Sequence, residues 1–194
     1  MGRDCFFEKT FENTYFSNIG IVLGDYENCT FNNCNFSGLN LSAIKFSECN
    51  FNSCNLSLAK LTKTALQDVK FKECKLLGLH FENCNDFLFS ADFDGCNLNF
   101  SSFYKKNIKK TRLKNCTLQE TDFSETDLTG SVFDNCDLAR ATFDHTILEQ
   151  VDFRTSYNYS IDPEMNRMKK TKFSLAGIVG LLDKYDIDVE QAGN

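Results

Sequence analysis

The chain of 194 residues has a formal net charge of −6, 20 Phe, 10 Cys, one Pro and no Trp. This acidity argues against direct, non-specific nucleic-acid binding, which needs a basic surface. No segment is long and apolar enough to cross a bilayer, and the N-terminal MGRDCFFEKT lacks the apolar run of a signal peptide. We therefore expect a cytoplasmic protein with no membrane association, in which thiols stay reduced.

A five-residue period runs through most of the chain. Every fifth residue from Phe6 to Phe81, and again from Phe93 to Phe153, is large and apolar, and the frame slips by two residues between Cys84 and Phe89. Small residues stand two positions before these apolar residues. Because side chains two apart in extended backbone point the same way, both columns are predicted to face inward. The predicted aromatic core includes Phe36, Phe51, Phe71, Phe93, Phe123 and Phe133.

The cysteines indicate the length of one turn. A period of five demands a corner at every fifth residue, and four corners close a turn of 20 residues. Nine of the ten cysteines lie in the column of small residues. Six of them recur every 20 residues, with a single gap of 22 that contains the slip: Cys34, Cys54, Cys74, Cys96, Cys116 and Cys136. The sequence thus predicts that these six side chains stack in one core column.

Little in the sequence indicates chemistry at these cysteines or elsewhere. Parallel inward thiols do not converge on a tetrahedral metal ion, and their geometry suits a disulfide poorly. We interpret them as structural and expect no metal and no cofactor. The alternative, a metal- or redox-sensing role, would act chiefly through Cys5, which lies off the column. His80 and His145 occupy outward positions on different coils, and no catalytic motif is present, so no enzyme is expected.

The repeats resemble the pentapeptide-repeat family, whose consensus is A(D/N)LXX. Examples are CNFSG at 34–38, CNLSL at 54–58, TDFSE at 121–125 and TDLTG at 126–130. The resemblance covers roughly residues 4–155. It implies an all-β solenoid, a right-handed quadrilateral β-helix, here of about 7.5 coils at 20 residues each.

The repeat fades after Phe153. We expect a repeat domain over 1–155, a connector over 156–172 that holds the only proline, and a C-terminal helix and tail over 173–194. An α-helix over 173–187 is predicted to cap the rod, with Ser174 as its N-cap. Gly177 and Gly180 disfavour a helix and indicate close packing against another backbone. The predicted homodimer contact comprises Leu175, Ile178, Val179, Leu181, Leu182 and Tyr185.

Charge is distributed unevenly along the chain. Residues 115–155 carry only two bases but nine acids: Glu120, Asp122, Glu125, Asp127, Asp134, Asp137, Asp144, Glu149 and Asp152. A basic cluster comes directly before them: Lys105, Lys106, Lys109, Lys110, Arg112 and Lys114. One interpretation is a solvated surface whose charges aid solubility. The other is an acidic patch that binds a basic protein partner.

The chain resembles the topoisomerase-protecting branch of the family, the quinolone-resistance and microcin-immunity proteins, in its single rod, terminal apolar helix and adjacent acidity. The resemblance implies a homodimeric bacterial DNA mimic that binds DNA gyrase or topoisomerase IV and is linked to antibiotic or toxin resistance. Two features depart from that branch: the projecting loops of transferable members are missing, and the basic cluster interrupts the acidic field. The alternative is a generic cytoplasmic scaffold that binds another protein partner.

Overall fold

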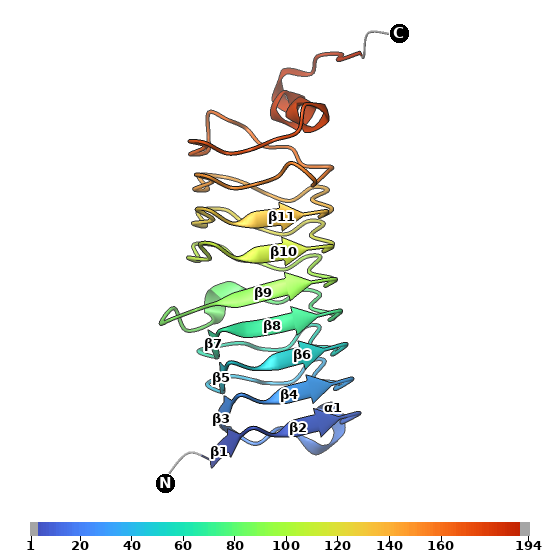
Figure 1. The fold of residues 1–194 in the computed structure, drawn as a ribbon, viewed down its shortest axis with the longest axis vertical. Helices are drawn as coiled ribbons and strands as arrows, with labels where there is room; N and C mark the ends of the chain where they lie inside the picture. The colour runs from blue at the N-terminus through green and yellow to red at the C-terminus, as the bar shows by residue number, and fades with distance from the viewer. Residues whose placement is uncertain (1–3, 191–194) are drawn as a thin grey trace.

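The chain folds into a parallel β-solenoid, a rod with its first and last described segments at opposite ends (Figure 1). The computed structural model describes residues 4–190. Residues 1–3 of the expected repeat domain and residues 191–194 of the expected tail lie outside the described residues. No helix within 4–190 has the length and apolar character needed to span a membrane.

Two parallel sheets run along the rod. The first contains β1 (Asp4–Phe7), β3 (Gly24–Glu27), β5 (Lys45–Ser47) and β7 (Ala65–Gln67), in that order. The second contains β2 (Thr10–Glu12), β4 (Thr30–Asn32), β6 (Asn50–Asn52), β8 (Val69–Lys72), β9 (Ala91–Asp94), β10 (Arg112–Lys114) and β11 (Val132–Asp134). Its seven strands span six turns, and single bridges extend its ladder to Asp152 and Lys172.

The register confirms the predicted turn length. Phe31 pairs with Phe51 and Phe51 with Phe71, each 20 residues on. Phe71 pairs with Phe93, 22 residues on, where the sequence has its two-residue slip. Two further ladders consist of single bridges, such as Asn35↔Asn55 and Ser102↔Asp122. Four ladders therefore follow one another at five-residue intervals around each turn.

The corners explain why a period of five replaces the period of two of an ordinary strand. Positive φ angles recur at five-residue intervals, as at Asn28, Asn33 and Gly38, and reset the direction of the chain. The residue between the two inward columns prepares the corner: the Asn35 side chain accepts a hydrogen bond from the Ser37 N–H at 2.9 Å. This local bond favours Asn and Asp at that position.

The core is a stack of apolar rungs. The rings of Phe11, Phe31, Phe51, Phe71 and Phe93 lie face to face at 4.6–5.4 Å between neighbouring centroids. The residues of the predicted core are all at most 3% exposed: Phe36, Phe51, Phe71, Phe93, Phe123, Phe133, Cys34, Cys54, Cys74, Cys96, Cys116 and Cys136.

The column of small residues joins successive turns by hydrogen bonds. The thiol of Cys54 donates to the carbonyl of Phe31, 23 residues earlier, at 3.2 Å, and its sulfur accepts the N–H of Cys34 at 3.4 Å. The Thr126 hydroxyl makes the equivalent bond to Phe103 at 2.7 Å. Cys, Ser and Thr thus share this column because each is small and can donate to the turn below.

The first sheet has no strand after β7, because the two-residue slip follows it; above the slip the same ladder continues only as single bridges. Residues 84–90 follow the short 3₁₀ helix η1 (Phe81–Asn83) and occupy the level above β7. In the next turn Lys106 fills the inward column and is only 2% exposed. Its ammonium donates to the Cys84 carbonyl at 2.6 Å and to the Asp86 carboxylate at 2.7 Å. The long side chain spans a gap that a short hydroxyl would leave open.

The rod continues beyond its expected end. Residues 156–172, expected to form a connector, carry bridges of the same ladders, at Tyr157, Arg167 and Lys172. The Ser156 hydroxyl donates to the Phe133 carbonyl at 2.8 Å, as column residues do in earlier turns. At the other end, a short helix that was not predicted, α1 (Phe16–Ile19), turns across the first coil.

The C-terminal segment differs from the predicted α-helix over 173–187. It forms two 3₁₀ helices, η2 (Ala176–Leu181) and η3 (Asp183–Tyr185), and no strand follows within 186–190. The Gly180 carbonyl accepts the N–H of Ile161 at 2.9 Å and is thereby diverted from an α-helical partner. The expected close packing is confirmed: side chains at Gly177 and Gly180 would collide with the hydroxyl and the backbone of Tyr159.

Candidate functional site

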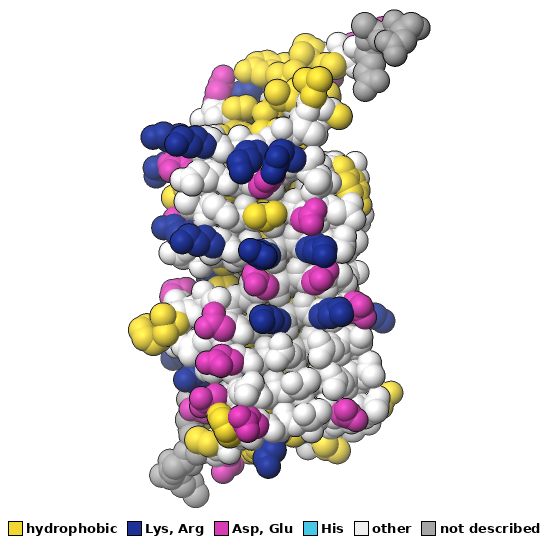
Figure 2. Space-filling view, in the orientation of Figure 1, with side chains coloured by type: hydrophobic (Ala, Val, Ile, Leu, Met, Phe, Trp, Pro, Cys, Tyr) yellow, Lys and Arg dark blue, Asp and Glu magenta, His cyan; other side chains and the backbone are white. Residues whose placement is uncertain are grey.

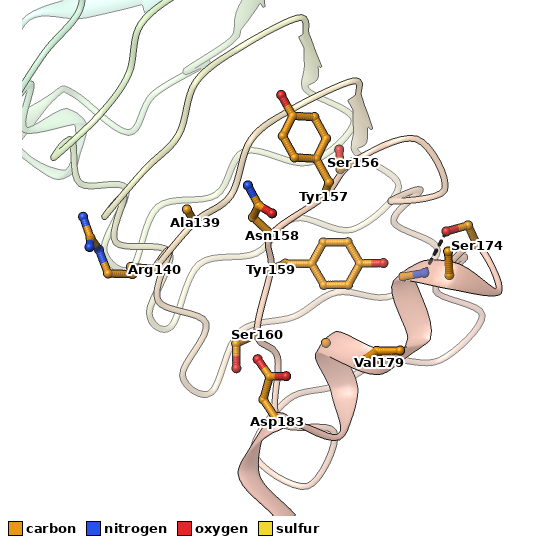
Figure 3. A pocket seen from close by; sticks show the side chains of 13 residues that line it. Ala139, Arg140, Ser156, Tyr157, Asn158, Tyr159, Ser160, Ser174, Val179 and Asp183 are labelled. Atoms are coloured by element: carbon orange, nitrogen blue, oxygen red, sulfur yellow. Dashed lines mark hydrogen bonds between the residues drawn. The ribbon is translucent and has the colours of Figure 1, made fainter. Parts of the chain in front are cut away.

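The last turns and η2 enclose a hollow of about 640 Å³. Figure 3 shows Tyr159 lying across it, with its hydroxyl directed at the turn where Ser174 accepts the Gly177 N–H at 3.0 Å. The Tyr159 hydroxyl has no hydrogen-bond partner in the described part of the chain, and burial raises its pKa. Arg140, at the rim, already pairs with Glu120. The hollow is therefore the seam between rod and cap, with Tyr159 as the contact that joins them.

An apolar surface covers the outer side of this cap. Leu175 is 88% exposed, and Ile178, Val179 and Tyr185 are also exposed. Figure 2 shows apolar side chains gathered at this end of the rod. Leu182 is half-buried, whereas Leu181 turns inward and packs against the core. Five of the six residues expected at a dimer contact thus lie at the surface, where apolar patches mark protein contacts; we call these five the C-terminal apolar patch.

The nine acids expected to bind a partner encircle the rod instead of sharing one face. Asp122, Asp127, Asp137 and Asp152 belong to four different ladders, each a quarter of a turn from the next. A partner that contacted all of them would have to surround these turns.

Four of these acids also shape the corners of the coil. Asp122 accepts the Ser124 N–H at 2.9 Å, and Asp127, Asp137 and Asp152 make the same bond to the residue two positions on. The Arg154 side chain lowers the pKa of Asp152 below its ordinary value of 3.8. Burial tends to raise the pKa of Asp127, but hydrogen bonds from Thr129 and Lys109 outweigh it and lower that pKa. The lowered pKa values keep the Asp127 and Asp152 carboxylates ionised at neutral pH.

Basic side chains neutralise much of the acidic field. Glu125 pairs with Lys105 at 3.5 Å and Asp127 with Lys109 at 3.0 Å. Two lysines of the basic cluster thus form ion pairs with acids of the next turn toward the C-terminus. Further pairs join turns or neighbours: Glu120–Arg140, Glu149–Arg167 at 2.8 Å and Asp152–Arg154 at 2.7 Å, and His145 contacts Asp144 at 2.7 Å. Within 4–190, only Asp122, Asp134 and Asp137 of the nine have no Lys, Arg or His partner within 4 Å.

The thiols lie mostly out of reach of solvent. Nine cysteines are buried and Cys5 is exposed. Burial raises the pKa of the Cys49 and Cys84 thiols to about 12. Among the described residues, no group of three or more His, Cys, Asp and Glu side chains is arranged to hold a metal ion.

Sequence reasoning missed the tip of the inserted segment. In this segment, residues 84–90, Phe87 is 69% and Leu88 64% exposed, and both follow Asp86, whose exposed carboxylate pairs with the buried Lys106. The available signal was two apolar residues at the one place where the five-residue frame fails.

The geometry defines the class of the protein: a parallel β-solenoid with a 20-residue turn, an interior of Phe and Leu rungs and a donor column that ties the turns together. The family model described as "Pentapeptide repeat region" matches residues 25–86 and 87–158. The chain therefore belongs to the pentapeptide repeat family. No curated protein matches it.

Two solved structures are similar to this chain at low sequence identity. A trypsin-treated form of QnrB1, a plasmid-mediated fluoroquinolone resistance protein, is 19% identical, with a TM-score of 0.57, and the match covers 98% of this chain and 100% of that one. HetL, a pentapeptide repeat protein involved in heterocyst differentiation regulation from Nostoc sp. strain PCC 7120, is 15% identical, with a TM-score of 0.37, over 89% of this chain and 87% of that one. The first likeness places the two chains in one fold.

Proposed function

We propose that this protein is a non-enzymatic cytoplasmic rod that modulates or protects DNA gyrase or topoisomerase IV by mimicking DNA. The observation that carries the proposal is the ring of acids around the turns nearest the C-terminal apolar patch. The shared fold with QnrB1, a fluoroquinolone resistance protein, points in the same direction. The four ladders per turn support a quadrilateral coil, and its right-handed winding is what the family resemblance implies.

A homodimer through the C-terminal apolar patch brings the acidic turns of two rods together at its centre. Duplex DNA presents one charge per roughly 1.7 Å of its axis, on all sides of the helix. Acids that encircle a rod suit a basic groove that holds DNA from several sides. Asp122, Asp134 and Asp137 contribute most, because the other six acids already face a base within the chain.

A gyrase supercoiling assay tests this proposal with variants that keep the corners intact. In Asp122→Asn/Asp134→Asn/Asp137→Asn three charges are lost, while the Asn side chains still accept corner hydrogen bonds, as Asn35 does. We expect the wild type to change supercoiling or its inhibition by a quinolone, and the triple variant to lose most of the effect. The matched control, Glu48→Gln/Asp68→Asn/Glu73→Gln, removes three charges far from the C-terminal end. We expect this control to keep the wild-type effect on supercoiling. A wild type that leaves gyrase and topoisomerase IV unchanged at micromolar excess contradicts the proposal.

A second candidate, a scaffold that binds another protein, is favoured by the exposed tip of Phe87 and Leu88. It predicts that Phe87→Ser/Leu88→Ser abolishes capture of that protein, whereas the triple acid variant does not.

A further inference from the structure

The outer face of the second sheet carries an ordered pattern of charge. Each strand presents two outward side chains, one on either side of its inward core residue, and we call such a pair a rung. From β8 to β11 the rungs are Lys70 and Lys72, Asp92 and Asp94, Arg112 and Lys114, then Val132 and Asp134. Figure 2 shows these basic and acidic bands alternating along the front of the rod.

These charges differ from the paired charges elsewhere on the rod. Within 4–190, none of the four basic side chains of β8 and β10 comes within 4 Å of a carboxylate, whereas Lys105, Lys109 and Arg154 each pair with one. Asp92 accepts only the backbone N–H of Arg112 at 2.9 Å, and Asp94 a long bond from the Asn115 amide at 3.4 Å. A hollow of about 350 Å³ runs over these strands. The face thus offers charges that the chain itself does not neutralise.

We propose that two copies of this chain associate face to face through these rungs, with their rods antiparallel. The two-fold axis runs along the strand direction, midway between β9 and β10. This operation sets Asp92 and Asp94 against Arg112 and Lys114 of the second copy, and the same contacts occur again by symmetry. It also sets Lys72 opposite Asp134 of the second copy, and Lys70 opposite Val132.

The charge pattern selects this arrangement over the others. With the rods parallel, every rung would face its own equivalent, and like charges in contact disfavour association. Acidic rungs between the basic ones would likewise repel the phosphates of a nucleic acid. A second copy carries the complementary order on its own surface, as an isologous contact requires.

The contact is small and polar. Four rungs at about 4.8 Å span only roughly 15–20 Å along the rod, so the buried area falls below the ~1,600 Å² of a standard interface. We therefore expect weak association that salt suppresses, because screening acts strongly on exposed charges. It uses no residue of the C-terminal apolar patch, and of the acids in the function proposed above it uses only Asp134.

Sedimentation velocity tests the association in a Leu175→Glu/Val179→Glu background, which removes the other contact. At about 50 mM salt we expect the average mass to rise with concentration toward that of a dimer, and at about 500 mM to return to that of a monomer. Asp92→Lys/Asp94→Lys and Arg112→Asp/Lys114→Asp should each stay monomeric, and an equimolar mixture of the two should associate again. The control Asp122→Lys/Asp144→Lys makes the same charge change half a turn away and should behave as the background. A background variant that is monomeric at every salt concentration overturns the proposal, as does a mixture that fails to associate.

Zero-length carbodiimide cross-linking of mixed isotopically labelled and unlabelled protein tests the antiparallel order. Lys72 and Asp134 lie three strand spacings apart within one chain, roughly 14 Å, so only a second copy brings them into contact. We expect a cross-link between Lys72 and Asp134 that joins labelled to unlabelled chains, and Lys72→Gln removes it. If copies associate but Lys72 and Asp134 never join, the antiparallel arrangement is wrong.

Discussion

The turns below and above the inserted segment 84–90 follow one winding rule but build different surfaces. Below it, strands form on two sides of the rod, from β1 to β7 and from β2 to β8, and thiols such as Cys29 and Cys49 supply the donors of the second sheet's column. Above it, the first sheet is replaced by single bridges, and in the second sheet's column the hydroxyl of Ser131 takes the place of those thiols. Most ion pairs also lie above it.

The comparison teaches that winding and surface are separable in this fold. The inward columns and the corners hold the coil whether the outward residues are neutral, as in Asn32 and Asn52, or charged, as in Asp134 and Arg154. The lower half can thus serve stability while the upper half varies its charge. The border between them depends on Lys106, the one buried charged side chain among the described residues.

The largest effect is expected from removing a ring in the lower half. Phe51 stacks between Phe31 and Phe71 at 4.6 and 5.0 Å and meets two further rings edge on. Phe51→Ala should cost about 3–5 kcal/mol, the range for a buried Phe, measured by urea unfolding. Phe133→Ala, which loses one stacked and one edge-on ring, should cost less. The reverse order would contradict the idea that the lower half carries more of the packing energy.

Substitution of two adjacent lysines tests how the inserted segment 84–90 is held between the lower and upper halves. Lys106→Met leaves the buried Cys84 carbonyl without its donor and should cost about 1–3 kcal/mol. Lys105, which is 57% exposed and forms a surface pair, provides the matched control, and Lys105→Met should change stability by less than about 0.5 kcal/mol. Thermal or urea unfolding of both variants distinguishes them. Equal small effects would show that the ammonium of Lys106 does not hold the inserted segment.

Alkaline pH should weaken the protein through its buried thiols. The pKa of Cys49 is raised from 9.0 to about 12 by burial, so the folded state keeps the thiol protonated while the unfolded state ionises. Stability is therefore complete below pH 9 and is lost as the pH rises toward 12. Each such thiol adds a slope of about 1.4 kcal/mol per pH unit. Unfolding free energies across this range should fall less steeply for Cys49→Ser, and an unchanged slope would argue that Cys49 is not protected.

The smallest effect is expected at the ion pairs of the upper half. Glu149→Gln removes the carboxylate that Arg167 contacts at 2.8 Å on the surface, and such pairs contribute about 0–1 kcal/mol. The difference from wild type should shrink further at about 1 M salt, where the Debye length is ~3 Å. A larger, salt-independent loss would mean that these pairs support the fold itself.

The winding of the coil could be predicted from the sequence, because it depends on contacts between residues that are close along the chain. The alternation of Phe36 with Cys34 places both side chains inside, and Asn35 between them prepares the corner. The 20-residue spacing of the cysteines then predicts which turns touch. Contacts that depend on side-chain reach between turns could not be predicted in this way.

Three features show that limit. Lys106 belonged to a surface cluster by sequence but is buried, because the inserted segment leaves a gap that its length fills. The acids of 115–155 were expected to form one patch, but a five-residue step moves each to the next side of the coil. The cap forms 3₁₀ helices, and its Gly180 carbonyl accepts a hydrogen bond from Ile161, 19 residues earlier in the chain, instead of from the next helical turn.

A thiol titration of the native protein tests most directly the claim that successive turns stack their cysteines inside the rod. We expect one thiol per chain, that of Cys5, to react at once with a water-soluble disulfide reagent, and the remaining nine to react only when the protein unfolds. Substituting Cys5→Ser should abolish the fast phase. Rapid reaction of three or more thiols in the folded protein would contradict the stacked column.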